Sequence, residues 1–227
     1  KAVFDLKLCS SCKRCMDSCV FGAIRSEDDK PYLKNFSCEG CGMCSLVCPE
    51  KAITLEKIYN AKLGYSDTRY GFKVVSAQLN IGASGSGKVV HQVRKKAEEL
   101  GDDAGLMLID SAAGISCPVI ASVTGTDHCI LVTEPTPSGL SDLKKAFGIV
   151  KHFDIPCSII INKHDINKRY AEKITQFAGE QDISIIAQIP FDKSFAMALT
   201  ELVPIIEYKV SYSLIFDRIA GHILDRL

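Results

Sequence analysis

The chain has 227 residues, 47% of them hydrophobic, which is ample for more than one packed core. Its 27 lysines and arginines equal its 27 aspartates and glutamates, so the global charge gives no indication of nucleic-acid or anionic-membrane binding. No apolar run approaches the ~20 residues that span a bilayer, and nothing resembles a signal peptide. We therefore expect a cytoplasmic protein with reduced thiols.

Cysteines dominate the first quarter of the chain, where eight of the eleven fall into two copies of one spacing that repeats after 29 positions. Three thiolates at consecutive two-residue gaps can occupy three corners of a four-iron cluster, because a tight backbone turn aims their sulfurs at one centre. The fourth corner must come from elsewhere. The two runs are Cys9, Cys12, Cys15 and Cys19, and then Cys38, Cys41, Cys44 and Cys48.

This doubled motif resembles the bacterial-type ferredoxin with two [4Fe-4S] clusters, over residues 1–57. Pro49 after Cys48 fits the family motif, whereas Val20 after Cys19 departs from it. In two-cluster ferredoxins the last cysteine of each run ligates the other cluster. The resemblance thus implies a small α+β domain with crossed ligation. Cluster one would take Cys9, Cys12, Cys15 and Cys48, and cluster two Cys38, Cys41, Cys44 and Cys19.

Zinc and disulfides are the rival interpretations of these cysteines. Structural zinc sites usually show separated pairs of ligands, not three cysteines at consecutive two-residue gaps. Disulfides are rare in a reducing cytoplasm. The spacing therefore favours iron-sulfur clusters.

We expect a linker over residues 58–70 and a second domain over residues 71–227. Short apolar runs alternate there with stretches of helical periodicity, which predicts a mostly parallel sheet flanked by helices. In such α/β sheets, ligands bind beyond the carboxyl ends of the strands. The predicted strands are residues 72–81, 104–109, 129–133, 158–161 and 183–189.

A glycine-rich segment from Gly82 to Lys88 follows the first of these strands and nearly matches the P-loop sequence motif. Backbone amides there could contact phosphates and Lys88 could reach the outer ones. However, Val89 stands where a P-loop has a magnesium-binding hydroxyl, and valine cannot ligate a metal. The alternative is a glycine-rich turn that simply begins a helix.

Two polar groups follow later apolar strands. Asp110 could hold the water shell of a bound magnesium, as Walker B acids do, or could simply cap the next helix. The sequence Asn162, Lys163, His164, Asp165 fits the pattern that places an amide and a carboxylate against a purine edge, and does not separate ATP from GTP. Together they form an ordered nucleotide-site pattern.

Over the rest of the chain these motifs resemble the MinD/ParA-type P-loop ATPases, and the whole chain resembles a subgroup with an inserted ferredoxin domain. The resemblance implies that Asp110 is the switch aspartate, Gly114 the glycine that senses the γ-phosphate, and Asn162 the adenine contact. The segments that carry it are residues 109–122, 132–139, 161–165 and 189–192.

In that subgroup the Walker A loop lies N-terminal to the ferredoxin insert, and this chain begins at the ferredoxin. Gly82–Lys88 corresponds to a later loop of the family. Phosphoryl transfer depends on groups that position the phosphates. We therefore expect no ATP hydrolysis by these 227 residues unless a Walker A segment precedes them. The nucleotide domain would take ATP and Mg²⁺ as cofactors.

Three further cysteines lie outside the two runs. Cys129 and Cys157 favour core packing. Cys117 begins a predicted helix, where it is either a packed residue or a thiolate with a redox or bridging-cluster role. His128, His152 and His164 are not read as ligands. Residues 214–224 predict an amphipathic helix that docks on the core rather than on a membrane.

The function that these expectations favour is low-potential electron transfer through two [4Fe-4S] clusters, gated by a nucleotide domain. The alternatives are a non-catalytic iron-sulfur docking module and a cluster-assembly scaffold. A redox partner protein is implied, and a homodimer or heterodimer through the nucleotide domain stays open.

Overall fold

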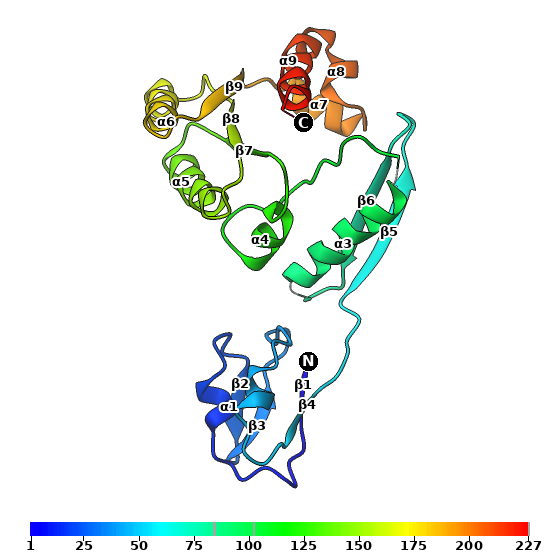
Figure 1. Ribbon diagram of the computed structural model, residues 1–227, viewed down its shortest axis with the longest axis vertical. Helices are drawn as coiled ribbons and strands as arrows, with labels where there is room; N and C mark the ends of the chain where they lie inside the picture. Colours follow the sequence, from blue (N-terminus) through cyan, green and yellow to red (C-terminus); the bar gives the residue numbers. More distant parts are fainter. Residues whose placement is uncertain (84, 102, 227) are drawn as a thin grey trace. The chain divides into compact units, whose positions relative to one another are not determined.

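The structure is a computed structural model that describes residues 1–83, 85–101 and 103–226 (Figure 1). The chain divides into two compact units, Lys1–Ile109 and Asp110–Leu227. Among the described residues, no helix is both long and apolar enough to cross a membrane. Each unit is described below by itself.

The first unit begins with two short antiparallel strand pairs and two one-turn helices. Strand β1 pairs with β4, and β2 pairs with β3, so the first and last strands join the two halves of the sequence repeat. The core beneath them is small and consists of Ala2, Cys15, Ile24, Cys44 and Ile53. The elements are β1 (Ala2–Phe4), α1 (Arg14–Asp17), β2 (Ile24–Glu27), β3 (Lys30–Leu33), α2 (Met43–Leu46) and β4 (Ile53–Leu55).

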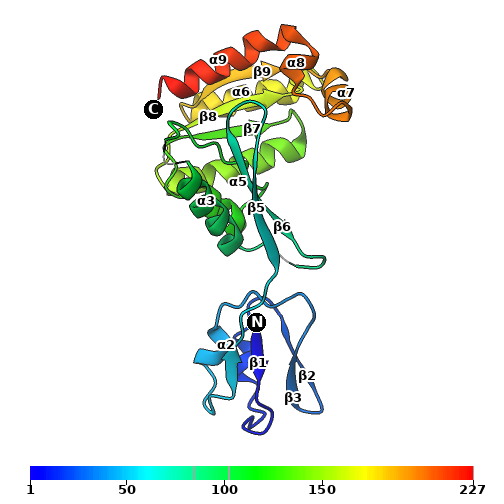
Figure 2. The ribbon, with the colours of Figure 1, turned by 90° about the vertical axis from the view of Figure 1, so that its right-hand side faces the viewer.

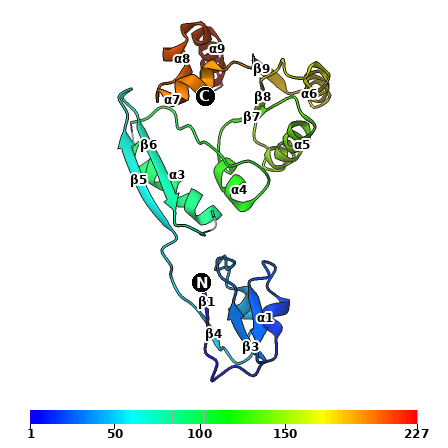
Figure 3. The ribbon, with the colours of Figure 1, turned by 180° about the vertical axis from the view of Figure 1, so that it is seen from behind.

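An antiparallel hairpin of β5 (Ala61–Asp67) and β6 (Lys73–Leu79) follows, with α3 (Gly87–Leu100) packed against it (Figure 3). Strand β5 thus occupies most of the range expected to be a linker. The polar stretch that indicated a linker, with Gly64, Ser66 and Asp67, belongs to β5 itself. In the hairpin turn that follows, Gly71 supplies a left-handed backbone with φ of 86°. The predicted strand at 72–81 exists, but it pairs with β5 and not in a parallel sheet.

The strand predicted at residues 104–109 is absent from the structure, in which these residues have no regular secondary structure. Leu108 is 75% exposed there. An apolar run becomes a strand only when a neighbouring strand pairs with it, and the described residues supply no such neighbour. This prediction from the sequence was therefore wrong.

The second unit is built on a parallel sheet in the order β7-β8-β9. The predicted strands at 129–133, 158–161 and 183–189 are confirmed, as are the helix that begins at Cys117 and the helix near the end of the chain. The elements are α4 (Cys117–Val123), β7 (Cys129–Thr133), α5 (Pro137–His152), β8 (Cys157–Asn162), α6 (Lys168–Glu180), β9 (Ser184–Ile189), α7 (Ser194–Thr200), α8 (Ile205–Tyr208), η1 (Val210–Tyr212) and α9 (Ser213–Leu224).

Helices cover both faces of this sheet (Figure 2). Ile159 and Ile161 of β8 are fully buried on the face that carries α5 and α6. Ile160 points the other way and packs with Ile219 of α9. Because both faces are covered, Ile159, Ile160 and Ile161 form an uninterrupted apolar run in the middle of the strand.

Candidate metal centres and sheet-edge site

The eight cysteines of the repeat lie around two cavities, and all eight are free thiols. Each cavity takes three cysteines from one run and the last cysteine from the other, which is the grouping that crossed ligation requires. Among the described side chains, no three donors meet at the spacing of a single metal ion. Cavity one is lined by Cys9, Cys12, Cys15 and Cys48, and cavity two by Cys19, Cys38, Cys41 and Cys44.

Left-handed backbone positions recur at the same interval as the cysteines and turn each run around its cavity. Ser11 has φ of 58° and Gly40, 29 residues later, has φ of 64°. Lys13 and Gly42 form the next such pair, with φ of 62° and 82°, directly before α1 and α2. The two runs therefore fold alike, although only one of each pair is glycine.

Backbone amides donate hydrogen bonds to the sulfurs of the crossing cysteines. The Ala23 amide donates to Cys19 Sγ and the Ala52 amide to Cys48 Sγ, each at 3.3 Å. Hydrogen bonds to cluster sulfurs are one of the main determinants of cluster potential. The identical pair shows that the repeat extends to the surroundings of the ligands.

The sulfur environment fits an iron-sulfur cluster. Burial is the main cause that raises the pKa of Cys15 and of Cys44, and the neighbouring cysteines raise it further. A buried thiol of this kind becomes a thiolate when a metal replaces its proton. Four sulfur donors around each cavity are the ligand set of a four-iron cluster.

Two lysines stabilise the backbone turns around cavity one. Lys30 Nζ donates to the carbonyl oxygen of Cys9 at 3.0 Å, and Lys13 Nζ pairs with Asp29 at 2.9 Å. This ion pair is exposed, so its contribution to stability is small.

In the second unit, polar residues gather at the carboxyl edge of the sheet. Asn162 ends β8, and Lys163 follows in a left-handed conformation with its Nζ 2.6 Å from Glu134, beyond β7. The Asp165 carboxylate accepts a hydrogen bond from the Phe191 amide, beyond β9, at 2.7 Å, and this bond lowers the pKa of Asp165. The turn after β8 is thus tied to the turns after both of its neighbours.

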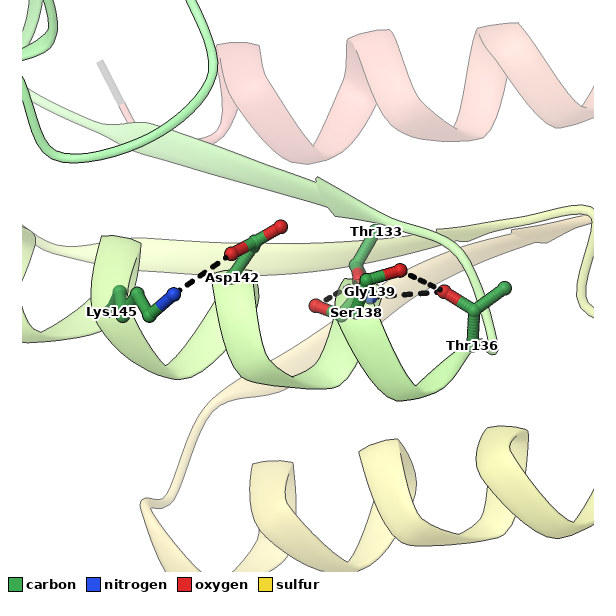
Figure 4. A network of polar contacts seen from close by, with 6 residues as sticks. All are labelled: Thr133, Thr136, Ser138, Gly139, Asp142 and Lys145. Carbon is green, nitrogen blue, oxygen red and sulfur yellow. Dashed lines mark hydrogen bonds and ion pairs between the residues drawn. The ribbon is translucent and has the colours of Figure 1, made fainter.

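The turn from β7 into α5 is tight (Figure 4). The Thr136 hydroxyl caps α5 by accepting from the Gly139 amide at 2.9 Å, and the Thr133 hydroxyl donates to the Gly139 carbonyl at 3.0 Å. A Cβ at position 139 would lie 2.2 Å from the Glu134 carbonyl oxygen. Glycine is therefore required where the helix begins against the strand.

The structure does not assemble all the nucleotide residues expected from the sequence. Asp110 is exposed, Gly114 has φ of 99°, and among the described residues no hydrogen bond or ion pair links either of them to Asn162. Lys88 lies in the first turn of α3, in the other compact unit. Ser84 of the glycine-rich segment lies outside the described residues.

Two polar clusters were not foreseen. Asp192, which follows β9, accepts from Lys209 Nζ at 2.6 Å and from the Tyr212 hydroxyl at 3.0 Å. These bonds lower the pKa of Asp192, and burial beside this carboxylate raises the pKa of Tyr212 to about 12. The position of Asp192 shortly after the apolar strand β9 was the signal that could have indicated it.

The second unforeseen cluster joins α9 to the sheet. The hydroxyl of Ser158, which is fully buried, lies 3.0 Å from His128 Nε2 and 2.9 Å from His222 Nε2. His128 Nδ1 is buried without a hydrogen-bond partner in the described part of the chain. No pattern in the sequence links residues 30 and 64 positions apart.

Comparison with known proteins agrees with this architecture. Residues 8–53 match the family model of the 4Fe-4S dicluster domain. The structure of the cell division ATPase MinD from Pyrococcus furiosus superposes with a TM-score of 0.50 at 22% sequence identity, over 65% of this chain and 61% of that one. The chain is therefore a two-cluster ferredoxin domain followed by a MinD-like fold.

It is homologous to two proteins of Methanocaldococcus jannaschii. The uncharacterized protein MJ0579 is 30% identical over 149 residues, which cover 66% of this chain and 53% of the relative. The uncharacterized protein MJ0578 is 32% identical over 160 residues, covering 70% and 55%. The chain thus spans about half the length of these relatives.

Proposed function

We propose that this chain is an electron-transfer protein whose ferredoxin domain carries electrons and whose MinD-like unit gates their delivery when it binds a nucleotide. The observation that carries the first half is the crossed arrangement of eight free cysteines around two cavities. Bound [4Fe-4S] clusters supply one-electron chemistry there.

The protein's own contribution is to fix the sulfurs and to set their surroundings. Buried Cys15 and Cys44 anchor α1 and α2 in the small core, so each run is held rigidly. The amides of Ala23 and Ala52 donate to the crossing sulfurs and stabilise added negative charge. Fixed ligands favour retention of a cluster and electron transfer, whereas a scaffold must release its cluster.

The gating half of the proposal is supported by the carboxyl edge of the β7-β8-β9 sheet, where ligands of α/β folds bind. We assign Asn162 as the purine contact, because the residues that follow it hold this turn in place. Lys163 pairs with Glu134, and the Asp165 carboxylate accepts a hydrogen bond from the Phe191 amide. Asp110 and Gly114 would contact phosphate and magnesium after the loop that carries them closes.

Electron delivery requires a partner protein on each side of the transfer. The crossing cysteine Cys48 and the exposed Leu46, 83% accessible, line one open hollow on the ferredoxin surface. Such a hollow gives a partner close access to a cluster ligand. A dimer through the nucleotide domain would be a second way to couple nucleotide and cluster.

The test is a redox titration of anaerobically prepared protein with and without a non-hydrolysable ATP analogue. We expect about eight irons per chain and a shift of the cluster midpoint potential when the analogue binds. Asn162→Ala should abolish the shift and retain the iron, and Asn60→Ala, the same change in the other unit, should retain both. An analogue that binds without moving the potential would contradict gating, and absence of iron would contradict electron transfer.

A further inference from the structure

The sequence repeat allows the walls of the two cavities to be compared position by position. Ser26 of β2 lines cavity one, and the residue 29 positions later, Leu55 of β4, lines cavity two. Their cross-strand partners also correspond, since Ser26 faces Pro31 and Leu55 faces Ala2. Each half of the domain is therefore a natural control for the other.

The formal charges of the residues that line the two cavities do not distinguish them. Lys13 and Asp29 line cavity one as an ion pair of 2.9 Å, so together they bring no net charge. Each cavity then has one further carboxylate, Glu50 in cavity one and Glu39 in cavity two. The formal charges of the walls are therefore equal.

Hydroxyl groups distinguish the two cavities. Ser10, Ser11 and Ser26 line cavity one, and none of the three hydroxyls bonds to another described protein group. The residues at the matching positions of cavity two are Glu39, Gly40 and Leu55. Cavity two has no serine or threonine among its lining residues in the described part of the chain. Hydroxyl donors therefore surround only the first centre.

This difference acts on reduction because each electron taken up adds a negative charge to the sulfur-ligated centre. Hydroxyl dipoles that can turn toward that charge stabilise it, and so does nearby water. Ser10 and Ser26 are exposed, so water also reaches this wall. An apolar wall such as Leu55 offers neither effect and leaves the reduced form less stable.

We propose that Ser10, Ser11 and Ser26 make cavity one the more easily reduced centre, so that the first electron taken up by the protein is held there and the second enters cavity two. The inference rests on the proposed electron-transfer function. Each step takes one electron from an external one-electron donor, reduced viologen in the experiment below. No bond to the protein forms or breaks.

The experiment is a potentiometric titration of the iron-loaded protein with viologen mediators, followed by electron paramagnetic resonance. Wild type should reduce in two resolved steps. Ser26→Leu should lower the midpoint of the higher step by about tenfold in equilibrium constant, ~59 mV for one electron. Leu55→Ser should raise the lower step and leave the higher one in place. Ser26→Thr and Leu55→Met, which keep the hydroxyl and the apolar wall, should change neither step.

If Ser26→Leu fails to load iron, Leu55→Ser alone still tests whether a hydroxyl on the wall raises the midpoint potential of the adjacent centre. If that variant moves the higher step, or if both wild-type steps coincide, the assignment is overturned while the electron-transfer role stands. A protein without iron would overturn both.

Discussion

At the scale of single residues, Cys48 links the two halves of the ferredoxin domain. It follows α2 in the second run, yet its sulfur lies with Cys9, Cys12 and Cys15 around cavity one. Cys48→Ser should therefore lose the iron of cavity one, about half of the total, as measured by iron analysis and electron paramagnetic resonance. Cys117→Ser, a change at an exposed thiol that lines neither cavity, should keep all of it.

Double variants decide whether the ligation is crossed. If Cys48 serves cavity one, adding Cys9→Ser to Cys48→Ser removes little further iron, because both changes damage the same centre. Adding Cys38→Ser removes the remainder. The opposite pattern would show that each run serves a single cavity.

The sequence predicted these ligands because thiol chemistry fixes their spacing, but it could not predict the walls. Ser26 and Leu55 become comparable only when the strand registers place both beside a cavity. The same limit applies at the sheet edge. Asn162 was foreseen from its place after an apolar strand, whereas the pairing of Lys163 with Glu134 depends on which strands are neighbours.

At the scale of elements, we expect the contact between α9 and the sheet to become less stable at low pH. Burial, with the charges of Arg226 and His222, lowers the pKa of His128 below its ordinary value of 6.5. The unfolded chain therefore binds a proton near pH 6.5 that the folded chain does not yet bind. The stability that comes from a neutral His128 is present above pH 6.5 and is lost as the pH falls toward the folded value.

Urea unfolding followed by circular dichroism at pH 7.5 and pH 6.0 should thus show a lower free energy of unfolding at pH 6.0. His128→Asn should reduce this difference. His152→Asn, the same change on α5, should leave it as in wild type. An unchanged difference in His128→Asn would place the acid sensitivity elsewhere in the protein.

Strands were predictable where tertiary packing agreed with local pattern. Residues 157–162 are apolar at nearly every position because helices cover both faces of β8. Residues 104–109 have a similar pattern but no strand, because pairing is not encoded in the run itself. Strand β5 was overlooked for the opposite reason, since this exposed strand contains many polar residues.

At the scale of the whole molecule, the two parts of the chain differ in what stabilises them. The ferredoxin core includes two of its own cysteines among five buried residues, so little apolar burial remains when iron is absent. The second unit has an extensive core around Ile159, Ile161 and Ile174. We expect the first to depend on metal and the second not to.

Hydrogen exchange after anaerobic removal of iron with a chelator tests this difference. The amides of Ala23 and Ala52 should lose protection, because the sulfurs that accept their hydrogen bonds are no longer fixed. Amides of β8 should exchange as slowly as before. Retained protection at Ala23 and Ala52 would show that the ferredoxin fold stands without its clusters.

The crossed cysteines also constrain how such a domain can arise. A single half of 29 residues brings three sulfurs to its own centre and sends the fourth outward, as Cys19 and Cys48 do here. Such a half could complete a cluster only with a second copy of itself, each chain lending one cysteine to the other. An ancestor with only one such half would therefore have been an obligate dimer. After fusion of the two copies, the residues that line one cavity could change independently of those that line the other.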